Sequence, residues 1–257
     1  MRYAIHFGIN KYDPAFYGPG VSLNMCVKDA GDLAMITGTG SPVSAGFDEC
    51  RLTLDGHATI SEFHRQISDH AKKAKRGDIV LFSQSSHGTY QDGPDGKRST
   101  GLCMNDGILW DFEARDAIKQ FNAGVLFVWL TDACFSESNW RFVAMLGQEA
   151  HGQRTARFFR LAKPQIIHPT QGNKKDIKAS MLAFSSSNIY QPSYEDGRGG
   201  AYTQSIIKAF TEDPTRSWYS LHRRASQLVA MDFPQTPVFE GVKSGPFTAK
   251  RAFTYNG

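Results

Sequence analysis

The chain has 257 residues, of which 40% are hydrophobic and 12% aromatic, so it can bury a full core, and we predict one domain over residues 1–257. The formal net charge of +4 is small, and Lys and Arg alternate with acids along most of the chain, which argues against a nucleic-acid partner. No stretch approaches the roughly 20 apolar residues of a membrane span, and the first residues contain no small-residue cleavage site, so we expect no membrane partner and a soluble, cytoplasmic protein. The four cysteines have no CxxC spacing, which argues against a zinc site and a disulfide scaffold.

Short, largely uninterrupted apolar runs alternate with helical patterns along the chain. Such runs are typical of strands buried on both faces of a parallel sheet. The predicted strands cover residues 3–9, 50–54, 78–84, 125–131 and 180–185, and the second is the weakest. Helical spacing of apolar residues follows at residues 27–36, 59–67, 112–121, 202–210 and 221–228, and residues 59–62 form a capping box. The alternation predicts an α/β fold, with a mainly parallel, doubly wound sheet and helices on both faces.

Two segments break this alternation. Asp-Gly pairs at residues 92–93, 95–96 and 106–107 predict a hairpin-rich insert. Residues 138–178 begin with a helical pattern around 140–146 and then become basic, which predicts an exposed loop around residues 150–179. The basic residues of this stretch are Arg154, Arg157, Arg160, Lys163, Lys174, Lys175 and Lys178.

Two chemically reactive residues end two of the apolar runs. His87 follows the third predicted strand, and Cys134 follows the fourth. In the common strand order 2-1-3-4 these strands are neighbours, and their carboxyl ends lie about 4.8 Å apart. A lone buried Cys is usually a small hydrophobe and a lone His a hydrogen-bonded structural group, but the pair at one sheet edge favours a nucleophile and its proton acceptor. The backbone amides of Gly88 and Cys134 are the candidate oxyanion donors.

The chain resembles the caspase-like cysteine peptidases, and among them the metacaspases and their bacterial relatives. The resemblance covers residues 3–237 and includes five elements in order. They are Gly-Ile-Asn-Lys-Tyr at residues 8–12, Asn-Met-Cys-Val-Lys-Asp-Ala at 24–30, Ser-Ser-His-Gly at 85–88, Asp-Ala-Cys at 132–134 and Gln-Thr-Pro at 235–237.

This resemblance implies the caspase fold, a three-layer sandwich, and an endopeptidase that cuts peptides and proteins after Arg or Lys through Cys134 and His87. It also implies that Asp29, Asp132 and Ser85 line the pocket for the basic residue. Other roles stay open for these three: a helix first-turn acid, a helix-capping carboxylate and a plain turn residue, respectively. Family members often cut themselves, so we expect self-processing in the basic loop between residues 154 and 178.

The chain also departs from the family pattern. The family usually has His-Ser-Gly after the nucleophile, whereas residues 135–137 are Phe-Ser-Glu. Calcium-dependent members carry acids after the His loop, where Asp106 and Asp111 are candidates, and another acid shortly after the Cys. Residues 138–142 contain no acid, so we expect no metal or other cofactor and do not favour calcium.

Two alternatives to an active peptidase remain. The departures at residues 135 and 137 are compatible with a catalytically inactive caspase-like scaffold that binds proteins. Flavodoxin-like nucleotide binding is poorly supported, because no Gly-rich phosphate loop follows any predicted strand. The oligomeric state is left open.

Overall fold

A computed structural model of the chain describes residues 1–39, 44–93, 98–134, 155–157, 159–161, 176–188 and 191–254. Its central sheet has the strand order β12-β9-β7-β3-β1-β2, and only β12 runs antiparallel to its neighbour. The strands are β1 (Arg2–Gly8), β2 (Glu49–Leu54), β3 (Ile79–Ser85), β7 (Leu126–Asp132), β9 (Ser180–Ser185) and β12 (Val238–Val242). The five strands predicted from apolar runs are therefore confirmed, and β3 lies next to β7 as the expected order requires.

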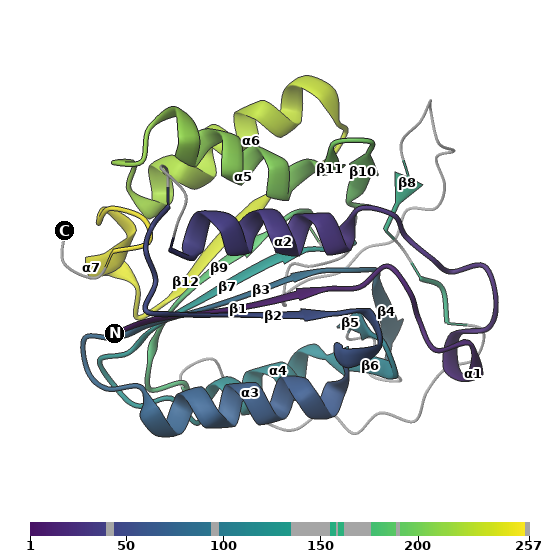
Figure 1. Cartoon of the computed structure of the whole chain (residues 1–257), viewed down its shortest axis with the longest axis horizontal. Coiled ribbons are helices and arrows are strands. Elements are labelled where there is room, and N and C mark those ends of the chain that lie inside the picture. The colour runs from purple at the N-terminus through teal and green to yellow at the C-terminus, as the bar shows by residue number, and fades with distance from the viewer. Residues whose placement is uncertain are drawn as a thin grey trace.

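Helices cover both faces of this sheet (Figure 1). One face carries α2 (Cys26–Thr37), α5 (Ala201–Glu212) and α6 (Trp218–Asp232), and the other carries α3 (Ile60–Lys73) and α4 (Asp111–Ile118). Alternate residues of β1, β3, β7 and β9 enter the two cores, because successive side chains of a strand point to opposite faces. Two short helices, α1 (Pro14–Tyr17) and α7 (Gly245–Thr248), and a 3₁₀ turn, η1 (Asp55–His57), complete the described helical segments.

Two small antiparallel sheets lie at the end of the molecule toward which β1 and β3 run (Figure 1). The first contains β4 (Gly88–Asp92), β5 (Arg98–Met104) and β6 (Gly107–Trp110), which confirms the hairpin-rich insert after His87. The second contains β8 (Thr155–Ala156), β10 (Tyr194–Asp196) and β11 (Gly199–Gly200). Both sheets therefore border the carboxyl ends of the central strands.

The predicted capping box at the start of α3 is half present, because Thr59 caps the helix while the Glu62 side chain bonds Arg65 and Gln66 and not the N–H of Thr59. Thr59 is extended, and its side chain accepts a hydrogen bond from the backbone N–H of Glu62 at 3.1 Å, which satisfies one of the free amides of the first turn. The apolar side of α3 then buries Phe63 and Ile67 against the sheet. Among the described helices, none is both long and apolar enough to cross a membrane.

The prediction of an exposed basic loop around residues 150–179 is wrong at Arg157. The Arg157 side chain is fully buried, although Arg160 and Lys178 are exposed as expected. The physical reason is a set of buried carboxylates contributed by other segments, described below. The helical pattern around residues 140–146 and the other basic residues of the loop lie outside the described residues.

Candidate active site

The two reactive residues follow neighbouring strand ends. Ser85, the last residue of β3, pairs with Asp132, the last residue of β7. His87 and Cys134 each come two residues later, so the chain leaves the sheet with both at the same edge. At Gly88 a side chain would collide with the backbone carbonyl oxygen of Cys134, so the two loops approach this closely only with glycine there.

The Cys134 thiol is buried, and its described hydrogen-bond partners belong to the backbone of one residue. Its Sγ accepts a hydrogen bond from the N–H of Ser193 at 3.1 Å and lies 3.6 Å from the carbonyl oxygen of the same residue. Burial raises the pKa of Cys134 to about 12, although the Ser193 N–H opposes that shift. The thiol is therefore protonated at neutral pH in this arrangement.

The His87 imidazole has one nitrogen fixed and one available. Nε2 lies 2.8 Å from the carbonyl oxygen of Val21, and because a carbonyl oxygen only accepts, Nε2 carries the proton. Nδ1 is buried and has no hydrogen bond to any described residue. Burial lowers the pKa of His87 to about 4, while the backbone carbonyls of Val21 and Arg157 oppose that shift. At neutral pH the ring is uncharged, with Nδ1 able to accept a proton.

The backbone around Arg157 crosses the site between these residues. Its carbonyl oxygen accepts hydrogen bonds from the N–H of Gly88 at 2.9 Å and from the N–H of Cys134 at 3.4 Å. Its own N–H donates to the carbonyl oxygen of Ser193 at 2.9 Å, and the N–H of Phe159 donates to the carbonyl oxygen of Gly88 at 3.0 Å. The two amides predicted as oxyanion donors thus point at one carbonyl group of the chain itself.

The Arg157 side chain fills a buried acidic pocket. Its Nη2 lies 2.6 Å from Asp29 Oδ2 and 3.1 Å from Glu195 Oε2, and its Nη1 lies 2.6 Å from Ser85 Oγ and 3.5 Å from Asp132 Oδ1. Its Nε donates to Glu195 Oε2 at 3.2 Å. Burial lowers the pKa of Arg157, but the surrounding carboxylates outweigh burial and raise it well above its ordinary value. The guanidinium is therefore charged and paired inside the protein.

Neutral donors hold the pocket carboxylates in place, and these donors come from several segments. Asp29 accepts from the N–H of Gly200 at 2.9 Å, from Ser85 Oγ at 2.8 Å and from Gln204 Nε2 at 3.0 Å. Asp132 accepts from Ser193 Oγ at 2.6 Å and from the N–H of Thr203 at 2.8 Å. Three carboxylates around one guanidinium leave an excess of negative charge, and hydrogen bonds from these neutral groups reduce the free-energy cost of burying that charge.

Gly200 forms one wall of the pocket. A side chain at this position would collide with Asp132 Oδ2, Arg157 Nη1 and Asp29 Oδ2. Any residue larger than glycine would therefore push into the space that the guanidinium occupies. The neighbouring Gly199 has a φ of 139°, a backbone conformation that favours glycine, so this turn depends on both glycines.

The structure brings all six predicted site residues together: Cys134, His87, Gly88, Asp29, Asp132 and Ser85 surround the backbone or side chain of Arg157. Sequence reasoning missed Glu195, Gly200 and Ser193. These three come from the short strands β10 and β11 or the residue before them, which have no periodic pattern. The Gly-Gly pair at the start of a helix was the one signal available.

The candidate calcium acids have structural partners. Asp106 Oδ1 accepts from the N–H of Ile60 at 2.9 Å, at the start of α3, and Asp111 Oδ1 accepts from the N–H of Phe112 at 2.9 Å. Residues 135–142, which depart from the family pattern, lie outside the described residues. The two acids therefore have local roles at helix starts.

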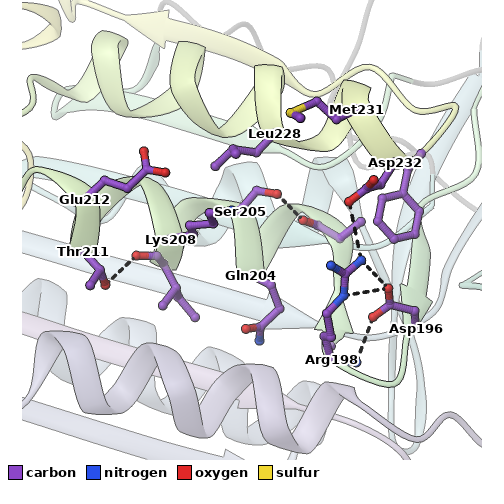
Figure 2. Close-up of a pocket in the computed structure, with 14 residues that line it drawn as sticks. Asp196, Arg198, Gln204, Ser205, Lys208, Thr211, Glu212, Leu228, Met231 and Asp232 are labelled. Carbon is purple, nitrogen blue, oxygen red and sulfur yellow. Dashed lines mark hydrogen bonds and ion pairs between the residues drawn. The ribbon is translucent and has the colours of Figure 1, made fainter.

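A separate groove lies between α5 and α6 beside this pocket (Figure 2). At one end Arg198 lies 2.7 Å from Asp196 and 3.6 Å from Asp232. Arg198 is 69% exposed, so these ion pairs contribute at most about 1 kcal/mol. Gln204 lines the groove and also bonds Asp29, so the groove borders the pocket through this side chain.

Comparison with known proteins identifies the family. The family model of the caspase domain, in peptidase family C14, matches residues 1–246, and the chain belongs to this family of cysteine peptidases. Among solved structures, protein GSU0716 from Geobacter sulfurreducens is similar over 100% of this chain and 99% of its own, with 26% identity and a TM-score of 0.75. Caspase-1 from Spodoptera frugiperda is similar over 93% of this chain and 85% of its own, with 16% identity and a TM-score of 0.59. A search of curated proteins gave no match. The three-layer α/β sandwich described above is the caspase fold.

Proposed function

We propose that the protein is a cysteine endopeptidase that cuts polypeptides after Arg, and less efficiently after Lys, and that it cuts itself between Arg157 and Phe158. One observation carries this proposal: Arg157 lies in the site where the residue before a cleaved peptide bond is expected. Its guanidinium is paired with Asp29 and Glu195, and its carbonyl oxygen accepts from the amides of Gly88 and Cys134. A peptide carbonyl so placed lies beside both the thiol and the imidazole.

The chemistry follows from the protonation states. Thiol and imidazole are both neutral at rest, so the Cys134 proton passes to His87 Nδ1 as Sγ bonds to the carbonyl carbon. The negative charge that develops on the carbonyl oxygen is stabilised by the two backbone amides. His87 then protonates the leaving amide nitrogen as the C–N bond breaks. Water hydrolyses the resulting thioester, which frees the new carboxyl group and returns the thiol.

Arg is favoured over Lys because the pocket matches a planar, forked donor. Glu195 Oε2 accepts from both Nε and Nη2 of Arg157, whereas Asp29 and Ser85 accept from its two terminal nitrogens. A Lys ammonium is a single point of charge and cannot reach all of these acceptors. An acidic residue would add a fourth negative charge to the pocket, so peptides with Asp before the cut should be rejected.

The proposal is tested by incubating the purified chain and reading its fragments by mass spectrometry. Wild type should give fragments ending at residue 157 and starting at residue 158, of about 17 and 11 kDa in proportion to the 28.5 kDa chain. Cys134→Ala and Arg157→Gln should stay whole, and Arg160→Gln, which alters an exposed Arg, should be cut like wild type. A single uncut band for wild type, or equal cutting of Cys134→Ala, would contradict self-processing.

The inactive scaffold is the second candidate, because the departures at residues 135 and 137 follow the nucleophile directly. Peptides that carry Arg, Lys or Asp before a fluorogenic group decide between the two. A scaffold would turn over none of them, and a peptidase of the proposed specificity would turn over the first two and lose this activity in Cys134→Ala.

We also propose that calcium is dispensable, because residues 138–142 supply no acid after the nucleophile. Activity in excess chelator should stay within a few-fold of that in millimolar calcium. An enzyme that is inert in chelator and restored by calcium would contradict this proposal.

A further inference from the structure

Phe159, two residues after Arg157, is bound by the same glycine as Arg157. The N–H of Gly88 donates to the carbonyl oxygen of Arg157, and the carbonyl oxygen of Gly88 accepts from the N–H of Phe159 at 3.0 Å. Gly88 therefore fixes the backbone on both sides of position 158. For a cut after Arg157, Phe159 is the second residue of the departing segment.

The Phe159 ring contacts a second aromatic ring. The centroids of Phe159 and Tyr17 lie 4.8 Å apart with an interplanar angle of 73°, an edge-to-face pair. Phe159 is half-buried and packs on the apolar core beneath α3 and α4, and Leu161 packs on the same core. Such aromatic pairs contribute beyond the apolar area that they bury.

Tyr17 is held in place by contacts that do not involve Phe159. Its hydroxyl lies 2.7 Å from the carbonyl oxygen of Met104 and 2.5 Å from that of Gly107, in the hairpin insert. The helix that carries it, α1, begins with a side-chain cap from Asp13. The Tyr17 ring also meets Tyr12 at 4.9 Å between centroids, and the Tyr12 ring lies 5.3 Å from the His87 ring. Because these contacts already fix the Tyr17 side chain, it loses little conformational entropy when a substrate binds.

We infer that Tyr17 forms a binding subsite for the second residue after the cut and selects an aromatic or large apolar side chain there. This inference rests on the proposed function and names its substrate class: polypeptides with Arg before the cut and an aromatic residue two positions after it. A small residue at this position leaves the Tyr17 ring exposed, and an acidic residue places a charge against apolar rings, so both bind less well.

Internally quenched peptides test the subsite directly on the wild-type enzyme. The series is Thr-Ala-Arg-Phe-Xaa-Gln, which follows the sequence of residues 155–160 with Gln replacing Arg160, and Xaa is Phe, Leu, Ala or Asp. We expect kcat/KM to be roughly tenfold higher for Phe than for Ala, with Leu between them and Asp lowest. Equal rates across the series, with cutting after Arg throughout, would overturn the subsite and leave the proposed function standing. Failure to cut any peptide would overturn both.

Variants of Tyr17 tie the preference to this side chain. Tyr17→Ala should reduce the Phe-to-Ala ratio toward one, and Tyr17→Leu should lose the preference of Phe over Leu while keeping that of Leu over Ala. Ratios measured within one enzyme do not depend on how much of it is folded. Tyr219→Ala, an exposed aromatic on α6, is the matched control and should keep the wild-type ratio. An unchanged ratio in both Tyr17 variants would overturn the assignment.

Discussion

The two faces of the central sheet differ in what they bury. Both layers contain aromatic rings: beneath α3, Phe63 meets Phe82 at 5.2 Å between ring centroids, and on the other face Phe184 meets Trp218 at 5.6 Å. Beneath α2 and α5 the layer includes buried Asp29 and Thr203, which bind the Arg157 side chain or its partner Asp132. None of the hydrogen-bond or ion-pair partners described for Arg157 comes from α3 or α4. The groups that recognise the basic residue therefore lie on the α2 and α5 face, so changes on the two faces should have separable effects on stability and on the preference for Arg over Lys.

The largest effect is expected on the face covered by α3. Phe63→Ala removes a fully buried ring and should lower the free energy of unfolding by about 3–5 kcal/mol. The ratio of Arg to Lys peptide cleavage should stay at the wild-type value, because the ring contacts described for Phe63 are with His64, Phe82 and Trp129, none of which binds Arg157. Denaturant unfolding and paired peptide assays measure the two quantities. Met231→Ala on α6, 77% exposed, is the control and should change neither. A changed Arg-to-Lys ratio in Phe63→Ala would break the proposed separation.

The second effect concerns charge in the pocket. Asp29→Asn keeps the shape but removes the carboxylate that lies 2.6 Å from Arg157 Nη2, and it points amide hydrogens toward other donors. Losing one member of such a buried charge pair costs about 2–5 kcal/mol, so kcat/KM on Arg peptides should fall by about thirtyfold or more.

The matched control for this change is Asp69→Asn. Asp69 pairs with Arg65 at 2.9 Å on the solvent side of α3, and an exposed pair contributes at most about 1 kcal/mol. Its cleavage rates should stay within twofold of wild type. Similar losses in both variants would mean that the assay reports general destabilisation rather than pocket charge.

Acid should lower the free energy of unfolding through two buried imidazoles on the face covered by α2, α5 and α6. His6 bonds Ser83 and Thr37, and His222 bonds Tyr202. Burial lowers the pKa of His6 to about 3 and that of His222 to about 4. The unfolded chain takes up these protons below its ordinary His pKa of about 6.5, so stability is complete above that pH and is lost as the pH falls toward 4.

The share of this effect that comes from His222 can be measured separately. For His222 the loss between pH 6.5 and 4 should be on the order of 2 kcal/mol, and His222→Gln should remove that part of the pH dependence. His57→Gln, on an exposed histidine, is the control and should keep the wild-type dependence. Unfolding midpoints measured across this range provide the test. An unchanged dependence in His222→Gln would exclude His222 as its source.

Most of the fold could be predicted because its signals are local. Uninterrupted apolar runs predicted the strands of the sheet, and the capping box predicted the start of α3. His87 and Cys134 could be assigned to one sheet edge because each ends such a run. Asp29, Asp132 and Ser85 came from the family resemblance, since an acid in a first helical turn has an ordinary structural role.

The rest of the site depends on contacts between distant segments. Arg157 has the composition of an exposed loop, and its burial is stabilised only where Asp29, Asp132 and Glu195 converge from three other elements. Glu195 lies in a strand of three residues, too short for a periodic signal. No local pattern distinguishes such a Glu from any exposed acid beside a turn.

The smallest expected effect concerns Glu195 and the preference of the pocket for Arg over Lys. Glu195→Gln keeps the side chain's length and one oxygen but removes a charge that accepts from both Nε and Nη2 of Arg157. A Lys side chain has no counterpart of Nε and depends more on Asp29 and Asp132, so it should lose less from this change. We expect kcat/KM to fall about tenfold on Arg peptides and about twofold on Lys peptides, which corresponds to a difference of about 1 kcal/mol. Peptides that differ only in the residue before the cut measure this ratio, and Glu240→Gln, a partly buried acid on β12, is the control that should keep it. An equal loss on both peptides would mean that Glu195 supplies negative charge to the pocket without recognising the guanidinium fork.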